Sequence, residues 1–349
     1  MARAIQDSAG RDIVLAASRW HVKVVTSSYA WFMKSLQERF AFATRDLDRN
    51  VTYLAGVSGG RDSVVLLHLL QQGGFTKLTL CHLDHSTRSA SKKDLQFVQQ
   101  LANLSHLRVI HDTLAKSPDS KSLEAKLRKK RQEFFARCTL ETEAAGVFLG
   151  HHADDVAETF LWNLLRGSGT SGLGGLSPKK EIQTEDGPIL LLRPMLDIWR
   201  SEIDDYVRIH SLPFVEDDSN RSRRFTRNRL RHDILPWLEG KLGRNVRQNL
   251  HRTAAILAEE NRFFENLIGP RDGEAPLSVS SLKEQPIALQ RRIILSWLQH
   301  HHVAEAGFDE VELVRSLLKT GAGPARVNLS QNRQARRCAG KITLALQGD

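Results

Sequence analysis

The 349-residue sequence is poor in cysteine and has no long apolar run. Its cysteines are Cys81, Cys138 and Cys338, an odd number without a CxxC motif. This pattern argues against a disulfide framework or a zinc knuckle and indicates a reducing compartment. No stretch approaches the roughly 18 apolar residues that span a bilayer, so we expect a cytoplasmic protein that does not enter a membrane.

The N-terminus also lacks the features of a secretory signal. It contains Asp7 and Asp12 and no clean apolar core, which argues against a signal peptide. A transit peptide stays open, because arginine and serine are present. Residues 1–40 are interpreted as an N-terminal extension, although Ser27 to Phe40 has the pattern of an amphipathic helix capped by Ser27 or Ser28.

Basic residues exceed acidic ones. Lys and Arg number 50 against 40 Asp and Glu, which gives a net charge of +10. Such a charge can serve solubility alone, but basic residues that neutralise phosphates release counterions, and their clustering here favours a nucleic-acid partner. The length predicts two domains, and a hydrophobic content of 41% is enough to build their cores.

Strand-like and helix-like segments alternate between residues 51 and 192. The expected strands are residues 51–57, 78–82, 108–112, 146–150 and 188–192. This alternation predicts an α/β fold with βαβ units and a parallel sheet covered by helices on both faces. Ligands of such sheets bind at the carboxyl ends of the strands, so the residues that follow each strand are candidates for function.

The remaining segments complete a two-domain prediction. Residues 41–240 are expected to form the α/β domain, residues 241–320 a smaller helical domain, and residues 321–349 a short β-like tail. Helices are expected at Ile198–Ile209 and Thr226–Leu238. Gly167 to Pro178 is rich in glycine and serine and is expected to be a loop, either a linker or a mobile loop that faces the substrate.

The strongest local signal is the segment from Ser58 to Ser63, which lies between the first strand and its helix. Its glycines let the backbone approach a ligand closely, and the helix that follows offers free N–H groups and a positive dipole end to an anion. Asp62 would be repelled by a polyphosphate, so it is either a residue of the helix cap or a ligand of Mg²⁺. The segment is neither a Walker A loop nor a GxGxxG loop.

This SGGxDS segment resembles the pyrophosphate-binding loop of the N-type ATP pyrophosphatases, the PP-loop superfamily. These enzymes cleave ATP to AMP and pyrophosphate. The resemblance therefore implies ATP and Mg²⁺ as cofactors, with Asp62 as the metal ligand. It implies that ATP is bound by Ser58, Gly59, Gly60, Arg61, Asp62 and Ser63.

Three further blocks resemble the tRNA(Ile)-lysidine synthetases. HLDHSTR (82–88) is similar to the family pattern H-x-[ND]-H-G-L-R, with Ser86 and Thr87 in place of Gly and Leu. HHADDVAET (151–159) is similar to HHxDDQxET, with Val156 in place of Gln. EDDSN (216–220), RNRLR (227–231) and Pro236 match ED-x-SN…RN-x-x-R…P, and residues 124–131 fit a weaker E-x-x-x-R-x-x-R pattern.

The resemblance to this family implies roles for individual residues. Catalytic roles are implied for Asp62, Asp155, Arg227 and Arg231. Contacts to lysine or tRNA are implied for His82, Asp84, His85, Arg88, Glu124, Arg128, His152, Asp154, Glu158, Asn220 and Asn228. On physical grounds, Asp154 and Glu158 would share one face of a helix at i and i+4 and could hold an ammonium group, although a helix cap explains Asp154 equally well.

Two basic segments have two interpretations each. Arg221 to Arg231 contains six arginines in eleven residues, and residues 126–131 read KLRKKR. Either segment can be a solvated face. Arginine also binds phosphate with two parallel hydrogen bonds, so either segment can contact an RNA backbone or the active site.

The implied reaction joins free L-lysine to the wobble cytidine of the isoleucine tRNA with a CAU anticodon. ATP adenylates the base, and the ε-amine of lysine then displaces AMP. A tRNA thiolase with the same loop is a rival, but it would need cysteine sulfur carriers or iron–sulfur ligands. A ligase of the GMP-synthetase type would need a glutaminase region, and a tRNA-binding protein with a decayed site is a third alternative. A homodimer stays open.

Overall fold

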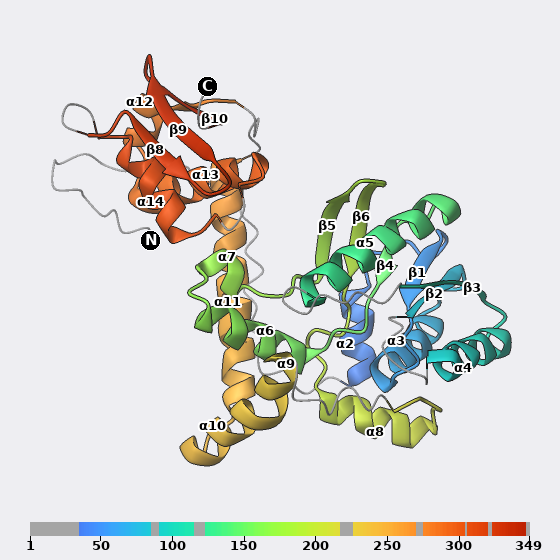
Figure 1. Ribbon diagram of the computed structural model, residues 1–349. Coiled ribbons are helices and arrows are strands. Elements are labelled where there is room, and N and C mark those ends of the chain that lie inside the picture. The colour runs from blue at the N-terminus through green and yellow to red at the C-terminus, as the bar shows by residue number, and fades with distance from the viewer. Residues whose placement is uncertain are drawn as a thin grey trace, which may run out of the picture.

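The computed structural model describes residues 35–84, 91–114, 123–216, 226–269, 275–303, 306–319 and 323–346. Within these ranges the chain forms two units, one around a six-stranded sheet and one around a four-stranded sheet. The long helix α11 (Val246–Ile268) packs on helices of the first unit and reaches the second (Figure 1).

The six-stranded sheet has the order β3-β2-β1-β4-β6-β5. Its strands are β1 (Tyr53–Gly56), β2 (Leu78–Asp84), β3 (Arg108–Thr113), β4 (Val147–Phe148), β5 (Lys179–Thr184) and β6 (Gly187–Leu192). All neighbouring strands pair in parallel except β5, which is antiparallel to β6. The predicted parallel sheet is thereby confirmed, with β5 as an additional edge strand.

The first unit also contains helices that cover the sheet or pack on one another (Figure 1). They are α2 (Leu36–Ala43), α3 (Arg61–Gln72), α4 (Ser91–Leu104), α5 (Leu123–Thr142), α6 (Ala153–Leu165), α7 (Thr170–Leu173), α8 (Arg200–His210), α9 (Thr226–Arg229), a π-helix (Leu230–Ile234) and α10 (Leu235–Leu242). Ser35 caps α2 by accepting a hydrogen bond from the Glu38 N–H at 3.2 Å, while most of the helix expected from Ser27 lies outside the described residues. The short α7 lies within the segment expected to be a loop.

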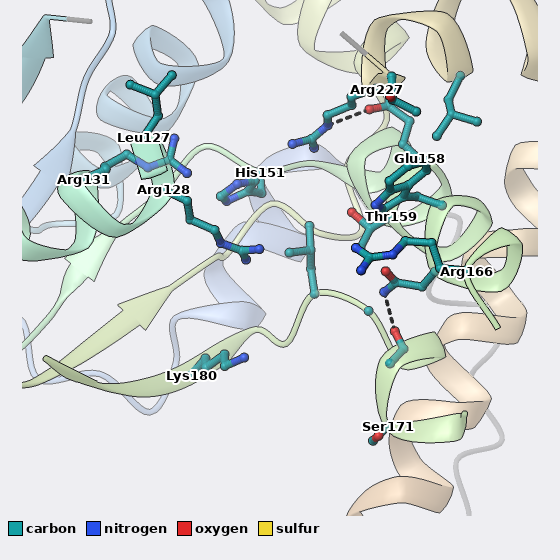
Figure 2. Close-up of a pocket in the computed structure, with 17 residues that line it drawn as sticks. Leu127, Arg128, Arg131, His151, Glu158, Thr159, Arg166, Ser171, Lys180 and Arg227 are labelled. Atoms are coloured by element: carbon teal, nitrogen blue, oxygen red, sulfur yellow. Dashed lines mark hydrogen bonds and ion pairs between the residues drawn. The ribbon is translucent and has the colours of Figure 1, made fainter. Parts of the chain in front are cut away.

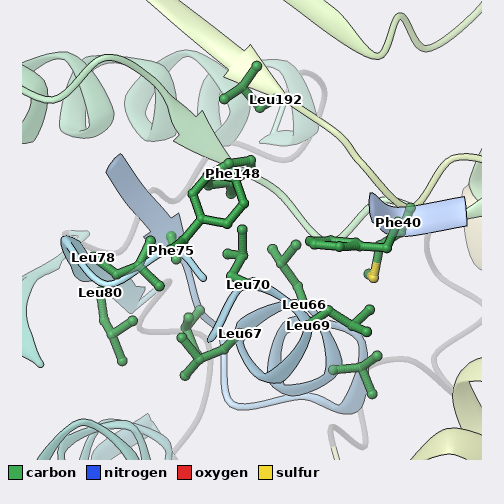
Figure 3. Packing of buried hydrophobic residues seen from close by; sticks show 14 of the residues in the cluster. Phe40, Leu66, Leu67, Leu69, Leu70, Phe75, Leu78, Leu80, Phe148 and Leu192 are labelled. Atoms are coloured by element: carbon green, nitrogen blue, oxygen red, sulfur yellow. The ribbon is translucent and has the colours of Figure 1, made fainter. Parts of the chain in front are cut away.

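The core of the first unit lies between α3 and the sheet. Leu66 and Leu70 of α3 are fully buried, and Phe75 packs edge-on against Phe148 with the ring centroids 5.3 Å apart (Figure 3). Each such leucine contributes about 1.5–3 kcal/mol through burial. The apolar spacing of α3 thus fixes the helix on the sheet, and its N-terminus is held at the carboxyl end of β1.

The second unit combines helices with an antiparallel sheet of order β7-β10-β9-β8. Its elements are β7 (Leu277–Ser278), α12 (Val279–Lys283), α13 (Ile287–His300), α14 (Phe308–Ser316), β8 (Arg326–Leu329), β9 (Arg333–Cys338) and β10 (Lys341–Leu346). Ile294, Trp297 and Val314 of the helices share one buried core with Ala335 and Ile342 of the strands. The expected β-like tail therefore packs together with the expected helices. In the described part of the chain, no helix is long and apolar enough to cross a membrane.

The sheet order places the ends of β1 and β4 side by side. The chain builds β2 and β3 on one side of β1, and β4 and β6 on the other, so the strand order reverses between β1 and β4. Such a reversal leaves a crevice at the carboxyl ends of the two strands, where open α/β sheets bind their ligands. The loop after β1 and the residues after β4 meet in this crevice.

Candidate active site

The loop after β1 folds into a turn suited to an anion. Gly59 has a φ of +89°, and a Cβ at this position would lie 3.3 Å from the Phe97 ring. The Gly60 N–H donates to the Ser58 hydroxyl at 3.3 Å, and the Ser63 hydroxyl donates to the Gly60 carbonyl at 2.8 Å. Because α3 begins directly after Gly60, its N-terminal N–H groups and positive dipole end lie at this turn.

A cavity of about 290 Å³ opens at this loop. Its lining comprises Gly56, Val57, Ser58, Asp62, Ser63, Cys81, Leu83, Arg131, Phe135, Leu149, Gly150 and His151. Cys81, Leu83 and Phe135 make part of the wall apolar, whereas Ser58 and Ser63 contribute hydroxyl groups. This division suits a ligand with an aromatic base and a phosphate chain.

Asp62, in the first turn of α3, has one carboxylate oxygen that is buried without a partner, Oδ1. Its other oxygen, Oδ2, accepts a hydrogen bond from Arg200 Nη1 at 2.9 Å and lies 3.9 Å from His152 Nε2. Burial raises the pKa of Asp62, and His152 and Arg200 oppose that shift. Among the described residues, no three His, Cys, Asp or Glu side chains form a metal cage. A single carboxylate with a bare oxygen beside a phosphate loop fits Mg²⁺, which proteins commonly hold through one or two carboxylates and the substrate phosphates.

Two carboxylates and two arginines form a second cluster at the start of α6. Asp155 and Glu158 are buried, and Arg227 and Arg231 each contact both. Arg227 Nη2 lies 2.8 Å from Asp155 Oδ1 and its Nε 2.9 Å from Glu158 Oε2. Arg231 Nη2 lies 3.0 Å from Asp155 Oδ1 and its Nε 2.5 Å from Glu158 Oε1. Although burial raises the pKa of Asp155, Arg227 and His152 outweigh that effect and hold the pKa of this carboxyl group below its usual range.

Asp154 faces away from this cluster. Its Oδ2 accepts a hydrogen bond from the Arg200 backbone N–H at 2.9 Å and lies 3.6 Å from His152 Nδ1. Glu158 therefore shares its two arginines with Asp155, three residues before it on α6. The sequence had placed Asp154, four residues before Glu158, beside it, and the structure does not. Burial lowers the pKa of His152, but Asp155, Asp154 and Asp62 outweigh that effect and raise it.

His151 follows β4 and lines two adjoining cavities, the one at the phosphate loop and a larger one of about 530 Å³. Its Nδ1 is buried without a hydrogen-bond partner. Burial lowers the pKa of His151 to about 3, and the nearby Arg193 and Arg227 act in the same direction. The imidazole is therefore neutral at physiological pH, and it can accept or donate a hydrogen bond between the two cavities.

The larger cavity lies between α5, α6, α7 and β5 (Figure 2). Its lining comprises Leu127, Arg128, Arg131, His151, Glu158, Thr159, Trp162, Asn163, Arg166, Ser171, Gly172, Gly175, Leu176, Lys180, Thr226, Arg227 and Leu230. Arg131 and His151 line both cavities, so the two spaces meet at these side chains. The segment expected to be a loop at residues 167–178 supplies one wall.

The other predicted site residues have varied positions. His82 is buried on β2, with Nδ1 2.9 Å from the Val57 carbonyl, and Asp84 ends the same strand. Arg61 donates to Asp204 at 2.5 Å and stacks over the Phe214 ring. Asn228 lies on α9, and Glu124 lies in α5 with its side chain outside what the structure describes. His85, Arg88 and Asn220 lie outside the described residues.

Three site residues received no role from the sequence. Arg200 neutralises Asp62 from α8, and no local motif marks it, because the two residues lie 138 positions apart. A Cβ on Gly150 would lie 3.1 Å from the Asp62 carbonyl oxygen, so a larger residue here would press on the first turn of α3. A glycine directly after a buried strand is a signal that could have revealed this contact. His151 stands in a recognised block, but its position between two cavities is visible only in three dimensions.

A parallel sheet with this loop after β1, and a cluster of carboxylates and arginines after β4, defines a PP-loop nucleotide-binding protein. Residues 32–238 match the PP-loop domain family, and residues 272–344 match the TilS-like substrate binding domain family. The chain is 33% identical over 300 residues to the tRNA(Ile)-lysidine synthase of Thermosynechococcus vestitus, covering 83% of this chain and 85% of that one. It is 34% identical over 317 residues to that of Synechococcus sp., covering 89% and 94%, and 36% identical over 298 residues to that of Gloeobacter violaceus, covering 81% and 88%.

The chain therefore belongs to the tRNA(Ile)-lysidine synthase family, and the resemblance seen in its motifs is confirmed. Among solved structures, it is similar to the U34-tRNA thiolase NcsA from Methanococcus maripaludis. The TM-score is 0.52 at 18% identity, covering 74% of this chain and 88% of that one. At this identity the likeness shows the shared fold alone.

Proposed function

We propose that this protein joins free lysine to the wobble cytidine of an isoleucine tRNA with a CAU anticodon, at the expense of ATP. One observation above all supports this reaction within the family. The cavity at the phosphate loop and the larger cavity adjoin at His151 and Arg131. A nucleotide in the first cavity can thus present its α-phosphate to a base and an amine in the second.

In the proposed complex, the triphosphate lies on the turn formed by Ser58, Gly59 and Gly60, against the N-terminus of α3. The apolar wall around Phe135 accepts the adenine. Mg²⁺ held by Asp62 Oδ1 would offset charge on the departing pyrophosphate. These contacts leave the α-phosphate near Arg131, whose positive charge would stabilise the negative charge on the phosphorus oxygens during the transfer.

In the first step, O2 of the cytidine attacks the α-phosphorus. An oxygen–phosphorus bond forms, and the bond from the α-phosphorus to pyrophosphate breaks, which leaves an adenylated base. The protein acts chiefly by placement, since proximity and orientation alone can supply about 7–11 kcal/mol of the barrier. A wobble base lies in a single-stranded loop and can be turned into a pocket at modest cost.

In the second step, the ε-amine of lysine attacks C2 of the base. A carbon–nitrogen bond forms, and the carbon–oxygen bond to AMP breaks. The lysine ammonium must first lose a proton to solvent water, and the neutral His151 beside both cavities can accept a hydrogen bond from the resulting amine. Glu158 lines the larger cavity and retains lone pairs beyond those used by the two arginines, so it can hold the ammonium at the cavity wall.

An incorporation assay tests the proposal. Purified protein is supplied with labelled lysine, ATP, Mg²⁺ and the CAU-anticodon isoleucine tRNA transcript, with Asp62→Ala as the control. Label in the tRNA that depends on ATP and is lost in the control would support the reaction. AMP formation on tRNA without lysine incorporation would indicate another base-modifying reaction, and the absence of both would favour a binding protein without activity.

A further inference from the structure

Three cationic side chains enter the larger cavity from different elements. Arg128 comes from α5, Arg166 from the C-terminal end of α6, and Lys180 from β5 (Figure 2). None of the three forms an ion pair with another described residue. Lys129, next to Arg128 on the same helix, differs in this respect, because its Nζ lies 3.1 Å from Glu185 and 3.6 Å from Glu133.

A fourth cation increases the charge behind this wall. Arg193 is 3% exposed, donates from Nη1 to the Ser177 carbonyl at 2.8 Å, and has a buried Nε without a partner. Burial lowers the pKa of Arg193, and with the smaller effects of Arg128 and Arg131 the pKa falls to about 10. Partial desolvation, Arg128 and Arg193 also lower the pKa of Lys180. These cations are close enough to repel one another, so an anion bound among them would be stabilised.

The cavity offers little negative charge in return. Glu158 is the only carboxylate among its described lining residues, and both Arg227 and Arg231 already contact it. The cavity therefore has a positive field that favours an anionic ligand.

An aromatic side chain lies beside these cations. Trp162 lines the cavity and is 38% exposed, and the Arg166 guanidinium lies 5.6 Å from the centroid of its ring. Exposed aromatic rings and arginine planes are surfaces on which unpaired bases stack. A cationic wall with such a platform fits a single nucleic-acid strand better than one carboxylate, because a strand carries a phosphate on each side of every base.

We infer that Arg128, Arg166 and Lys180 form a phosphate cradle for the RNA strand on both sides of the target base, with Trp162 as a stacking platform. This inference rests on the proposed function, because it takes the strand to be the substrate RNA. The cradle holds the backbone at the cavity mouth while the base turns toward His151. Phosphate contacts of this kind set position and contribute salt-dependent affinity without reading sequence.

The test measures binding of a fluorescent anticodon stem-loop RNA to the full chain by anisotropy, without ATP or lysine, at several KCl concentrations. Arg166→Ala and Lys180→Ala are compared with Lys129→Ala as the matched control. Each cradle variant should weaken binding about 5- to 10-fold at 0.1 M salt and reduce the slope of log K against log[salt] by about 0.7 to 1. Lys129→Ala should change binding less than about twofold, since its charge is engaged elsewhere.

Two results would overturn the cradle. The first is RNA affinity and salt slope equal to those of the unaltered protein in both cradle variants. The second is unchanged RNA affinity with a raised KM for lysine, which would assign these cations to the lysine carboxylate. Because the binding assay contains neither ATP nor lysine, a protein that binds the stem-loop through the cradle but incorporates no lysine would refute the proposed reaction and leave the cradle standing.

Discussion

Glu158 and Glu312 provide a matched test of what burial adds to an ion-pair cluster. Each carboxylate accepts hydrogen bonds from two arginines, Glu158 from Arg227 and Arg231 at the candidate site, and Glu312 from two arginines of the second unit. The side chain of Glu158 is 1% exposed and that of Glu312 is 25% exposed. The substitutions Glu158→Gln and Glu312→Gln keep the shape and remove the charge in both places.

The two substitutions should differ clearly in cost. Removing one partner of a buried pair costs about 3–5 kcal/mol. Arg227 and Arg231 are themselves 39% and 26% exposed, so water offsets part of this loss, and we expect about 2–3 kcal/mol for Glu158→Gln. For Glu312→Gln we expect no more than about 1 kcal/mol, the usual range of exposed pairs.

Calorimetric unfolding of the unaltered protein and both variants measures this difference. With about 2–4 °C per kcal/mol for a domain of this size, Glu158→Gln should lower the transition of the first unit by about 4–12 °C. The second unit is smaller and shifts by about 4–8 °C per kcal/mol, so Glu312→Gln should lower its transition by no more than about 8 °C and leave lysine incorporation unchanged. Equal losses of unfolding free energy in the two variants, or a shift below about 2 °C for Glu158→Gln, would show that burial does not give the site cluster its stabilising effect.

Three further predictions concern the core, a histidine and a close backbone contact. Measured by urea unfolding, Leu70→Ala should lower the free energy of unfolding by about 2–5 kcal/mol, because Leu70 is fully buried. Leu104 is 80% exposed, so Leu104→Ala should change it by no more than about 0.5 kcal/mol, and equal changes would contradict the core assignment. Burial lowers the pKa of His251, but Asp197 outweighs it and raises the pKa above 6.5. The stabilisation that protonated His251 provides should therefore be complete below pH 6.5 and decline as the pH rises through the pKa of the folded state. In urea unfolding, His251→Gln should lower the free energy of unfolding more at pH 5.5 than at pH 8.5, and the reversed order would refute the assignment. Gly150→Ala should weaken ATP binding about 10-fold in calorimetric titration, because its Cβ would press on the first turn of α3 from 3.1 Å; unaltered affinity would mean that the turn yields without cost.

Local signals in the sequence were enough to predict the sheet and the phosphate loop. Short apolar runs ending in glycine or polar residues mark β1 and β4, and the spacing of Leu66 and Leu70 marks the helix that packs on them. The strand β5 was not predicted, because its sequence KKEIQT is polar and gains its strand character only from pairing with β6. Antiparallel pairing at a sheet edge leaves most of its side chains in solvent, so it carries little hydrophobic pattern.

The directions of charged side chains in the site could be predicted only in part. Helical spacing alone placed Asp154 with Glu158, yet the N–H of Arg200 draws Asp154 to the start of α8. The contact between Arg200 and Asp62 depends on how α8 packs beside α3, which no short-range pattern encodes. The π-helix at Leu230–Ile234, next to Arg227, likewise has no signature in local propensity.

The polar sequence of β5 has a consequence for how the edge of the sheet meets other molecules. An edge strand presents unpaired N–H and C=O groups, which can recruit a strand from another molecule. Lys179, Lys180 and Glu181 are exposed on this edge, and charged side chains there oppose such pairing. The charged residues that make β5 hard to predict from sequence thus also oppose aggregation through this edge of the sheet.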